Sequence, residues 1–343
     1  MNLYWAVYEN LEEEILSLAD DIFFNDNQLG VYSLKIGNLI IRCSIEIESL
    51  SKELYSNLCE ELEDVDKKVN EKQELFFDTD CLSLLVDKWK IDRKKIQISN
   101  HKMQFSLRNS LLSPLHKSHK RGTSGSKWKQ AYQAFKHNRA SNLTQATVGN
   151  LLNALGALYI LNLYYSNDLF WYDVPIEGRE EYRRNSKIFS PFIYEVPGNI
   201  LASDEQIKTF GEIPFEDCIY LKRFTDNTVK EIKTLIFKYN LDIALQTITS
   251  ERFIQYKQEH LDEKEKIDAD FINKLGLGFR EMTTKVRVDK IPPEIYRSKE
   301  VVLNKNQEIY PRYEYKDFLK TSVAKQMIND RVAECNKKLN LVD

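Results

Sequence analysis

The first features of this chain that limit its function are absences. Its five cysteines are odd in number, widely dispersed and without CxxC spacing. This argues against a disulfide framework or zinc ribbon and favours a reducing, cytoplasmic location. The first twenty residues are acidic and amphipathic, which is not the pattern of a signal peptide. No cysteine or carboxylate accompanies His116 and His119, so we expect neither a metal site nor a cofactor.

A clean apolar run of eighteen residues is also missing. Residues 145–165 come nearest, with no proline and no charge, but Asn150, Asn153 and Asn162 interrupt them. We therefore expect the central helix of a soluble bundle, with Thr144 as its N-cap, and no membrane partner. Its apolar stripe consists of Leu151, Leu155, Leu158 and Leu161. Gly149 and Gly156 lie on another face and predict the close approach of neighbouring helices.

The most informative absence is that of acidic residues in the middle of the chain. Residues 93–167 contain 12 lysines and arginines and no aspartate or glutamate, whereas residues 1–92 contain 21 acidic and 8 basic residues. Two interpretations stay open. The bases pair with the acidic first third inside one fold, or they form a surface that binds RNA or another polyanion. The candidate nucleic-acid-binding residues are Lys117, Lys120, Arg121, Lys127 and Lys129.

The remaining pattern predicts a mainly α protein. Residues 1–166 form a helical bundle with a basic hairpin and loop inserted at 93–127, and residues 167–343 form a mainly helical region with short strands. Within residues 94–109, Ile96 and Ile98 alternate as a strand does and suggest a β-hairpin. The other expected elements are helices at 1–20, 33–62, 81–89, 127–139, 226–275 and 315–339, a flexible loop at 113–127, and extended segments near 170 and 192.

A second cluster of polar residues carries possible chemistry. Lys136, His137 and Arg139 lie together at a helix end, and Arg42 lies at the edge of the core stripe of the helix at 33–62. A histidine can act as a general base near neutral pH, while lysine and arginine can stabilise charge on a phosphate. These groups could cleave RNA without a metal. Alternatively, the cations only complement the dipole of a helix C-terminus.

These residues also carry a resemblance. The segment RCSIEIESLSKELY, followed by WKQAYQAFKHNR and a helix rich in alanine and leucine, resembles the HEPN superfamily over residues 1–166. The resemblance implies a helical bundle with RNA or nucleotide partners. It further implies a homodimer and, in many members, a metal-independent ribonuclease of bacterial toxin or phage-defence systems.

The family's catalytic pattern is an arginine with a histidine four to six residues later. With His137 as the histidine, Tyr132 or a neighbour stands where the arginine belongs. Either Lys136, Arg139 or Arg42 replaces it in space, or the chain is a non-cleaving module that binds RNA, nucleotide or a partner protein. In the implied homodimer, the expected contact surfaces are the apolar face around Leu151 and the aromatic residues 170–172.

Overall fold

The computed structural model describes residues 3–61, 74–167, 170–171, 185–198, 203–209, 213–248 and 298–310, with isolated residues at 292–295 and 322–337. It divides into two compact units. The first comprises Met1–Arg223 and Glu300–Gln307, and the second comprises Phe224–Lys299 and Glu308–Asp343. The chain is mainly helical with short strands, which confirms the predicted fold class.

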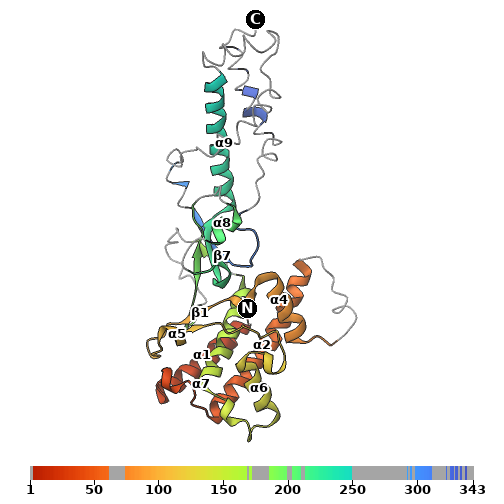
Figure 1. Cartoon of the computed structure of the whole chain (residues 1–343), viewed down its shortest axis with the longest axis vertical. Coiled ribbons are helices and arrows are strands. Elements are labelled where there is room, and N and C mark those ends of the chain that lie inside the picture. Colours follow the sequence, from red (N-terminus) through yellow and green to blue (C-terminus); the bar gives the residue numbers. More distant parts are fainter. Residues whose placement is uncertain are drawn as a thin grey trace. The chain divides into compact units, whose positions relative to one another are not determined.

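Four helices of the first unit form a bundle: α1 (Leu3–Asp21), α2 (Leu34–Glu61), α6 (Lys127–His137) and α7 (Val148–Ser166). The most extensive packing is between α2 and α7, and both α1 and α6 also pack on α7. In Figure 1 these helices lie together in the lower part of the picture. The short helix α4 (Ser83–Trp89) follows a π-helical turn η2 (Phe77–Leu82), which packs against α2.

The helix α7 is buried on nearly all sides because its apolar residues extend around its circumference. Its leucine stripe is fully inaccessible, and Asn162 donates from Nδ2 to the Leu158 carbonyl at 3.0 Å. Since Leu151 is 0 % exposed, it cannot serve as a dimer contact, and that part of the expectation is wrong. No described helix is long and apolar enough to cross a membrane.

The starts of α2 and α7 are capped by hydroxyl groups. The Oγ of Ser33 accepts the Ile36 N–H at 3.1 Å at the start of α2, as predicted. For α7 the predicted cap is wrong by one turn. Thr144 belongs to a 3₁₀ turn, η5 (Leu143–Gln145), and the Oγ1 of Thr147 accepts the Asn150 N–H at 3.2 Å.

The predicted hairpin at 94–109 is also wrong. Strand β1 (Ile96–Ile98) pairs antiparallel with β2 (Leu111–Leu112) on one side and β4 (Phe189–Pro191) on the other. The intervening chain contains the short helix α5 (Leu107–Ser110), and Leu107 is 78 % exposed. The partners of β1 come from outside the predicted hairpin, so local alternation could not identify them.

Two glycines explain how the elements approach one another. A Cβ on Gly37 of α2 would lie 2.4 Å from the Phe135 ring of α6, so this position admits no side chain. A Cβ on Gly156 of α7 would lie 2.7 Å from Ile96 Cδ1. The small face of α7 therefore admits strand β1, rather than the neighbouring helix that the sequence predicts.

The first unit extends past residue 166. A second sheet has the strand order β3-β7-β6-β5. Its strands are β3 (Phe170–Trp171), β5 (Ile193–Glu195), β6 (Tyr220–Phe224) and β7 (Lys299–Leu303). Short helical elements complete this unit: η1 (Asp26–Gln28), η3 (Ile91–Arg93), η4 (Gly122–Ser124), α8 (Asp204–Lys208) and η6 (Phe215–Asp217). The predicted extended segments near 170 and 192 thus include strands.

In the second unit, the structure describes the helix α9 (Asp226–Ile248). This confirms the first half of the helix predicted at 226–275. The rest of that helix lies outside the described residues. The predicted helix at 315–339 falls mostly outside them as well, and so does Tyr172 of the aromatic contact surface.

Candidate polyanion-binding cleft

Five of the twelve bases in the acid-free segment form ion pairs with carboxylates elsewhere in the chain. Lys102 Nζ lies 2.7 Å from Asp20 Oδ1, within the acidic first third. Arg93 and Lys95 both reach the buried Asp217, at 3.3 and 2.6 Å. Together with Arg121 and Lys129 they are called the paired cations below. Three of the five pair with the acidic first third, as one of the two interpretations predicts, whereas Arg93 and Lys95 pair with Asp217 outside it.

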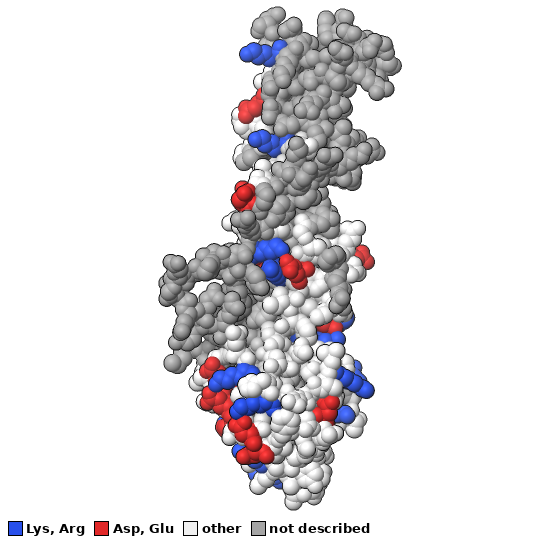
Figure 2. Space-filling model, turned by 90° about the vertical axis from the view of Figure 1, so that its left-hand side faces the viewer, with Lys and Arg blue, Asp and Glu red and all other residues white. Residues whose placement is uncertain are grey.

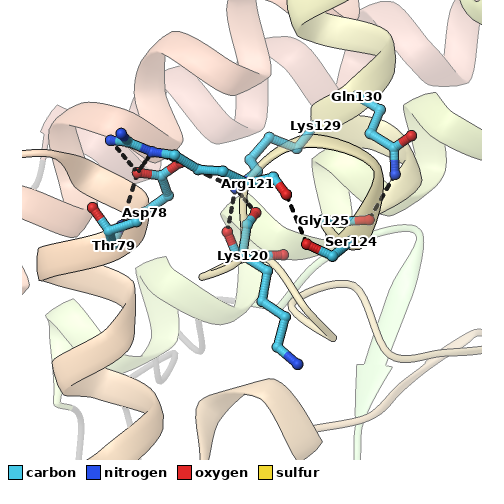
Figure 3. Close-up of polar contacts among 9 residues, drawn as sticks. Asp78, Thr79, Lys120, Arg121, Ser124, Gly125, Lys129 and Gln130 are labelled. Carbon is cyan, nitrogen blue, oxygen red and sulfur yellow. Dashed lines mark hydrogen bonds and ion pairs between the residues drawn. The ribbon is translucent and has the colours of Figure 1, made fainter.

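The remaining paired cations meet at Asp78, in η2. Arg121 donates from Nε and a terminal nitrogen to Asp78 Oδ1 at 3.1 and 3.0 Å (Figure 3). Its guanidinium also stacks on the Phe76 ring. Lys129 Nζ lies 3.2 Å from Asp78 Oδ2 and donates to the carbonyls of Ser118 and Lys120. The bonds of the Lys129 ammonium are therefore made within the fold.

The electrostatics of this cluster follow from its burial. Burial alone would raise the pKa of Asp78, but hydrogen bonds from Arg121 and the Thr79 N–H and the charge of Lys129 lower it below its usual value. Burial lowers the pKa of Lys129, and the attraction of Asp78 opposes this. The Lys129 side chain is only 5 % exposed, so its assignment as an RNA-contacting residue is corrected to a structural one.

This cluster holds the basic loop in a defined form. Residues 113–120 form successive turns, with bonds from the N–H groups of His116, Ser118 and Lys120 to carbonyls three residues earlier. Lys117 adopts a left-handed conformation with φ 59°, uncommon for a residue with a side chain. Trp128 Nε1 donates to the Pro114 carbonyl at 2.8 Å. The loop predicted to be flexible therefore consists of turns that are held by hydrogen bonds.

Four of the other seven bases of the segment converge beside this loop. A cleft of about 700 Å³ is lined by Arg108, Lys117, Lys120 and Lys127, called the cleft cations below. All four are exposed residues, and within the described part of the chain none has an ion pair or hydrogen bond through its side chain. None of the described residues that line the cleft is acidic. In Figure 3 the Lys120 side chain extends away from the Asp78 cluster.

The amide side chains of the cleft donate to groups within the fold. Each of four lining amides donates from its side chain to a partner in the chain: Asn109 to Asp26 Oδ1, Gln130 to the Gly125 carbonyl, Asn150 to the Gln145 carbonyl and Asn153 to the Gly149 carbonyl. Of the two aromatic rings in the described lining, the large one, Trp128, is 2 % exposed, so only the His116 imidazole is exposed. The cleft thus offers positive charge, but little hydrogen bonding or stacking to a base.

The predicted catalytic residues separate into two groups. Arg42 and Arg139 line one shallow groove together with Lys35 and Asn38. The contact of Phe135 with Gly37 brings them together, because Arg139 stacks on the Phe135 ring at 5.2 Å. One terminal nitrogen of Arg42 donates to both carboxylate oxygens of Glu14 at 2.7 Å. The Arg42 side chain is 47 % exposed.

The other two candidates do not line that groove. Lys136 Nζ lies 3.3 Å from the Tyr132 hydroxyl, and this bond, with the nearby charge of Glu48, raises the pKa of Lys136. His137 is the last residue of α6 and is exposed. Within the described residues its imidazole has no hydrogen bond or ion pair. The structure therefore brings Arg42 and Arg139 together, but not His137 and Lys136 with them.

Two features of the site, and one buried lysine outside it, are not apparent from the sequence. The predicted hairpin places Arg108 at the end of a strand, so its role in lining the cleft is not foreseen. The hydroxyl of Ser126, a cleft residue that is 9 % exposed, is buried without a partner in the part of the chain described. Lys94 is completely buried, and its Nζ likewise has no hydrogen-bond partner among the described residues.

The described residues contain no group of three or more histidine, cysteine or carboxylate side chains placed to hold a metal. On the face shown in Figure 2, acidic and basic side chains lie next to each other rather than in one large area of a single sign. Comparison of the chain with family models, curated proteins and solved structures found no match. The cleft itself must therefore carry the functional argument.

Proposed function

We propose that this protein binds RNA through the cleft lined by Arg108, Lys117, Lys120 and Lys127. The observation that carries the proposal is the sorting of charge within the acid-free segment. Five cations neutralise carboxylates of the fold, whereas these four share one cleft with no acidic residue in its described lining. Four like charges in one concave site repel one another, and a polyanion relieves that repulsion.

The chemistry of the cleft favours the phosphate backbone over the bases. Lysine and arginine are the usual phosphate-binding side chains, and phosphate contacts fix position without reading sequence. The amides that could read base edges already donate to groups of the fold, and Trp128 is covered. Binding is therefore sequence-independent and sensitive to salt.

The test is an affinity measurement on the full chain with a labelled single-stranded RNA of mixed sequence. The variant replaces Lys117, Lys120 and Lys127 with glutamate. This reverses the charge of these three positions without removing a hydrogen bond or ion pair of their side chains in the described part of the chain. The expected result is loss of binding at low salt. The matched control is Lys88→Glu, since Lys88 is an exposed lysine on α4, away from the cleft. Absence of binding by the unaltered protein, or equal loss in the control, would refute the proposal.

A second candidate function is metal-independent cleavage of RNA, as the HEPN resemblance implies. The specific observation in its favour is that Arg42 and Arg139 line one groove beside the helix that ends at His137. In this proposal His137 takes the 2′-hydroxyl proton, and Arg139, Arg42 or Lys136 stabilises the phosphate charge. His137→Ala should then reduce the cleavage rate by about 10²–10⁴-fold, with EDTA having no effect.

Cleavage that is unchanged in His137→Ala would remove this candidate while leaving RNA binding untouched. The homodimer that the resemblance implies belongs to the same candidate, because one copy supplies few catalytic groups. Light scattering at micromolar concentration tests it, and a monomer would count against a composite catalytic site.

A further inference from the structure

One end of the RNA-binding cleft is formed by the start of helix α6. Gln130 is the first residue of this helix whose N–H reaches a helical carbonyl, that of Ser126 at 3.1 Å. The N–H groups of Lys127, Trp128 and Lys129 therefore have no partner inside the helix. Lys127 and Trp128 both line the cleft. A helix start with free N–H groups and the positive end of the helix dipole favours an anion.

An independent observation at the same place is the hydroxyl of Ser126. This residue occupies the N-cap position of α6, but its side chain makes no capping hydrogen bond. It is 9 % exposed, lines the cleft, and its Oγ has no hydrogen-bond partner within the described residues. A buried hydroxyl without a partner is costly in a folded protein. A ligand oxygen at the helix start would supply the missing partner.

The donors and the charge at this point suit a terminal phosphate better than an internal phosphodiester. A phosphodiester presents two non-bridging oxygens and one charge, whereas a terminal phosphate presents three oxygens and a charge of about −1.5 to −2 at neutral pH. The helix start brings together the N–H groups of two cleft-lining residues, Lys127 and Trp128, with the Ser126 hydroxyl and the Lys127 ammonium. The volume of about 700 Å³ is that of a site for a compact ligand.

We propose that the start of α6 in this cleft is a seat for a terminal phosphate group, at the 5′ end of an RNA or of a free nucleoside polyphosphate. This rests on the proposed function insofar as the ligand is RNA. Ser126 and the N–H groups of Lys127 and Trp128 hold the terminal phosphate. Lys127, Lys120, Lys117 and Arg108 neutralise it and the phosphates that follow.

The experiment uses the full chain and four probes. Three are RNAs of identical sequence, labelled at the 3′ end, that carry a 5′-triphosphate, a 5′-monophosphate or a 5′-hydroxyl group. The fourth is a nucleoside triphosphate added alone. The variant is Ser126→Asp. Aspartate is a good N-cap and suits the helix dipole, so the fold is retained while its carboxylate repels phosphate. The matched control is Ser33→Asp, at the capped start of α2, which does not line the cleft.

The expected result is that a 5′-phosphate strengthens binding by at least about tenfold over the 5′-hydroxyl RNA. Ser126→Asp removes this difference, and Ser33→Asp preserves it. If the RNAs bind equally or not at all, but the nucleoside triphosphate binds in a manner that Ser126→Asp abolishes, the seat stands and its source is a free nucleotide.

Three outcomes overturn the seat. If the RNAs bind equally and the nucleoside triphosphate does not bind, RNA binding by the cleft stands but the terminal phosphate seat does not. If neither RNA nor nucleotide binds, both proposals fail together. The seat is also contradicted if Ser126→Asp binds the RNAs with the same preference as the unaltered protein. A melting temperature measured alongside shows whether a loss of preference in Ser126→Asp is due to unfolding.

Discussion

The paired cations and the cleft cations come from the same acid-free stretch of sequence, yet the fold treats them in opposite ways. Lys129 and Arg121 are held by Asp78, and Lys102 by Asp20. Lys120 and Lys127 have no ion pair in the described structure and face a shared cleft. A run of like charge in a sequence is thus no uniform basic surface, because the structure pairs some of the charges with carboxylates and leaves others unpaired in a cleft.

The two groups are also mechanically connected. Lys129 bonds the carbonyls of Ser118 and Lys120, so the buried pair with Asp78 fixes the backbone from which Lys117 and Lys120 project. A paired cation, Lys129, therefore helps to position the cleft cations Lys117 and Lys120. The predictions below separate these two roles.

The largest effect on stability is expected when the buried ion pair between Asp78 and Lys129 is removed. Asp78→Ala leaves the Lys129 ammonium buried without its carboxylate and should lower the free energy of unfolding by about 3–5 kcal/mol. Asp78→Ala combined with Lys129→Met should recover much of this loss, because no buried charge remains. Urea unfolding of the three proteins measures both. An unaltered stability in Asp78→Ala would mean that the pair does not hold the loop.

The pH dependence of this pair follows from the sign of its shift. The folded pKa of Asp78 lies below its ordinary value of 3.8. Its stabilisation is therefore present above about pH 4 and is lost as the pH falls through the folded pKa. The stability difference between the unaltered protein and Asp78→Ala should accordingly shrink in acid. A difference that stays constant to pH 2 would contradict the assignment.

Lys94 is neither a paired cation nor a cleft cation, because it is buried and its Nζ has no hydrogen-bond partner among the described residues. Burial lowers its pKa to about 7, although the charges of Cys218, Asp217 and Glu216 oppose this. Between pH 7 and 10.5 the unfolded chain holds a proton that the folded chain releases, so stability falls as pH falls through this range. Lys94→Met should therefore raise the free energy of unfolding by roughly 2–3 kcal/mol at pH 7. Its gain should be smallest above pH 10.5, and a gain independent of pH would contradict this account.

The smallest effect is expected at the exposed paired cation. Lys102 and Asp20 have side chains that are 42 % and 57 % exposed. Lys102→Gln should change the free energy of unfolding by less than about 1 kcal/mol, as thermal melting would show. A larger loss would mean that this surface pair anchors the loop at 99–105.

The sequence predicts the helices of the first unit well because their apolar spacing is local. The stripe of α2 and the buried leucines of α7 can be read from periodicity alone. The hairpin fails because β1 pairs with Phe189–Pro191, about ninety residues away. Thr147 displaces Thr144 as the cap of α7 because residues 143–145 form a separate 3₁₀ turn.

The candidate site is predictable only as a charged segment. The absence of acids marks residues 93–167, but nothing local distinguishes Lys129, which turns inward to Asp78, from Lys127, which lines the cleft. That difference arises from helix geometry and from Asp78, some fifty residues earlier in the chain. Arg108 and Ser126 are found only when the fold places them beside the basic loop.

The salt dependence of RNA binding tests the central claim most directly, since each phosphate contact contributes to the slope of log K against log salt. With four contacts to a single strand, the slope should be about −3. Lys120→Gln should reduce its magnitude by about 0.7, while Lys102→Gln, in the same acid-free segment but paired with Asp20, should leave it unchanged. Equal changes in the two variants, or no RNA binding by the unaltered protein, would contradict the sorting of cations into paired and ligand-binding groups.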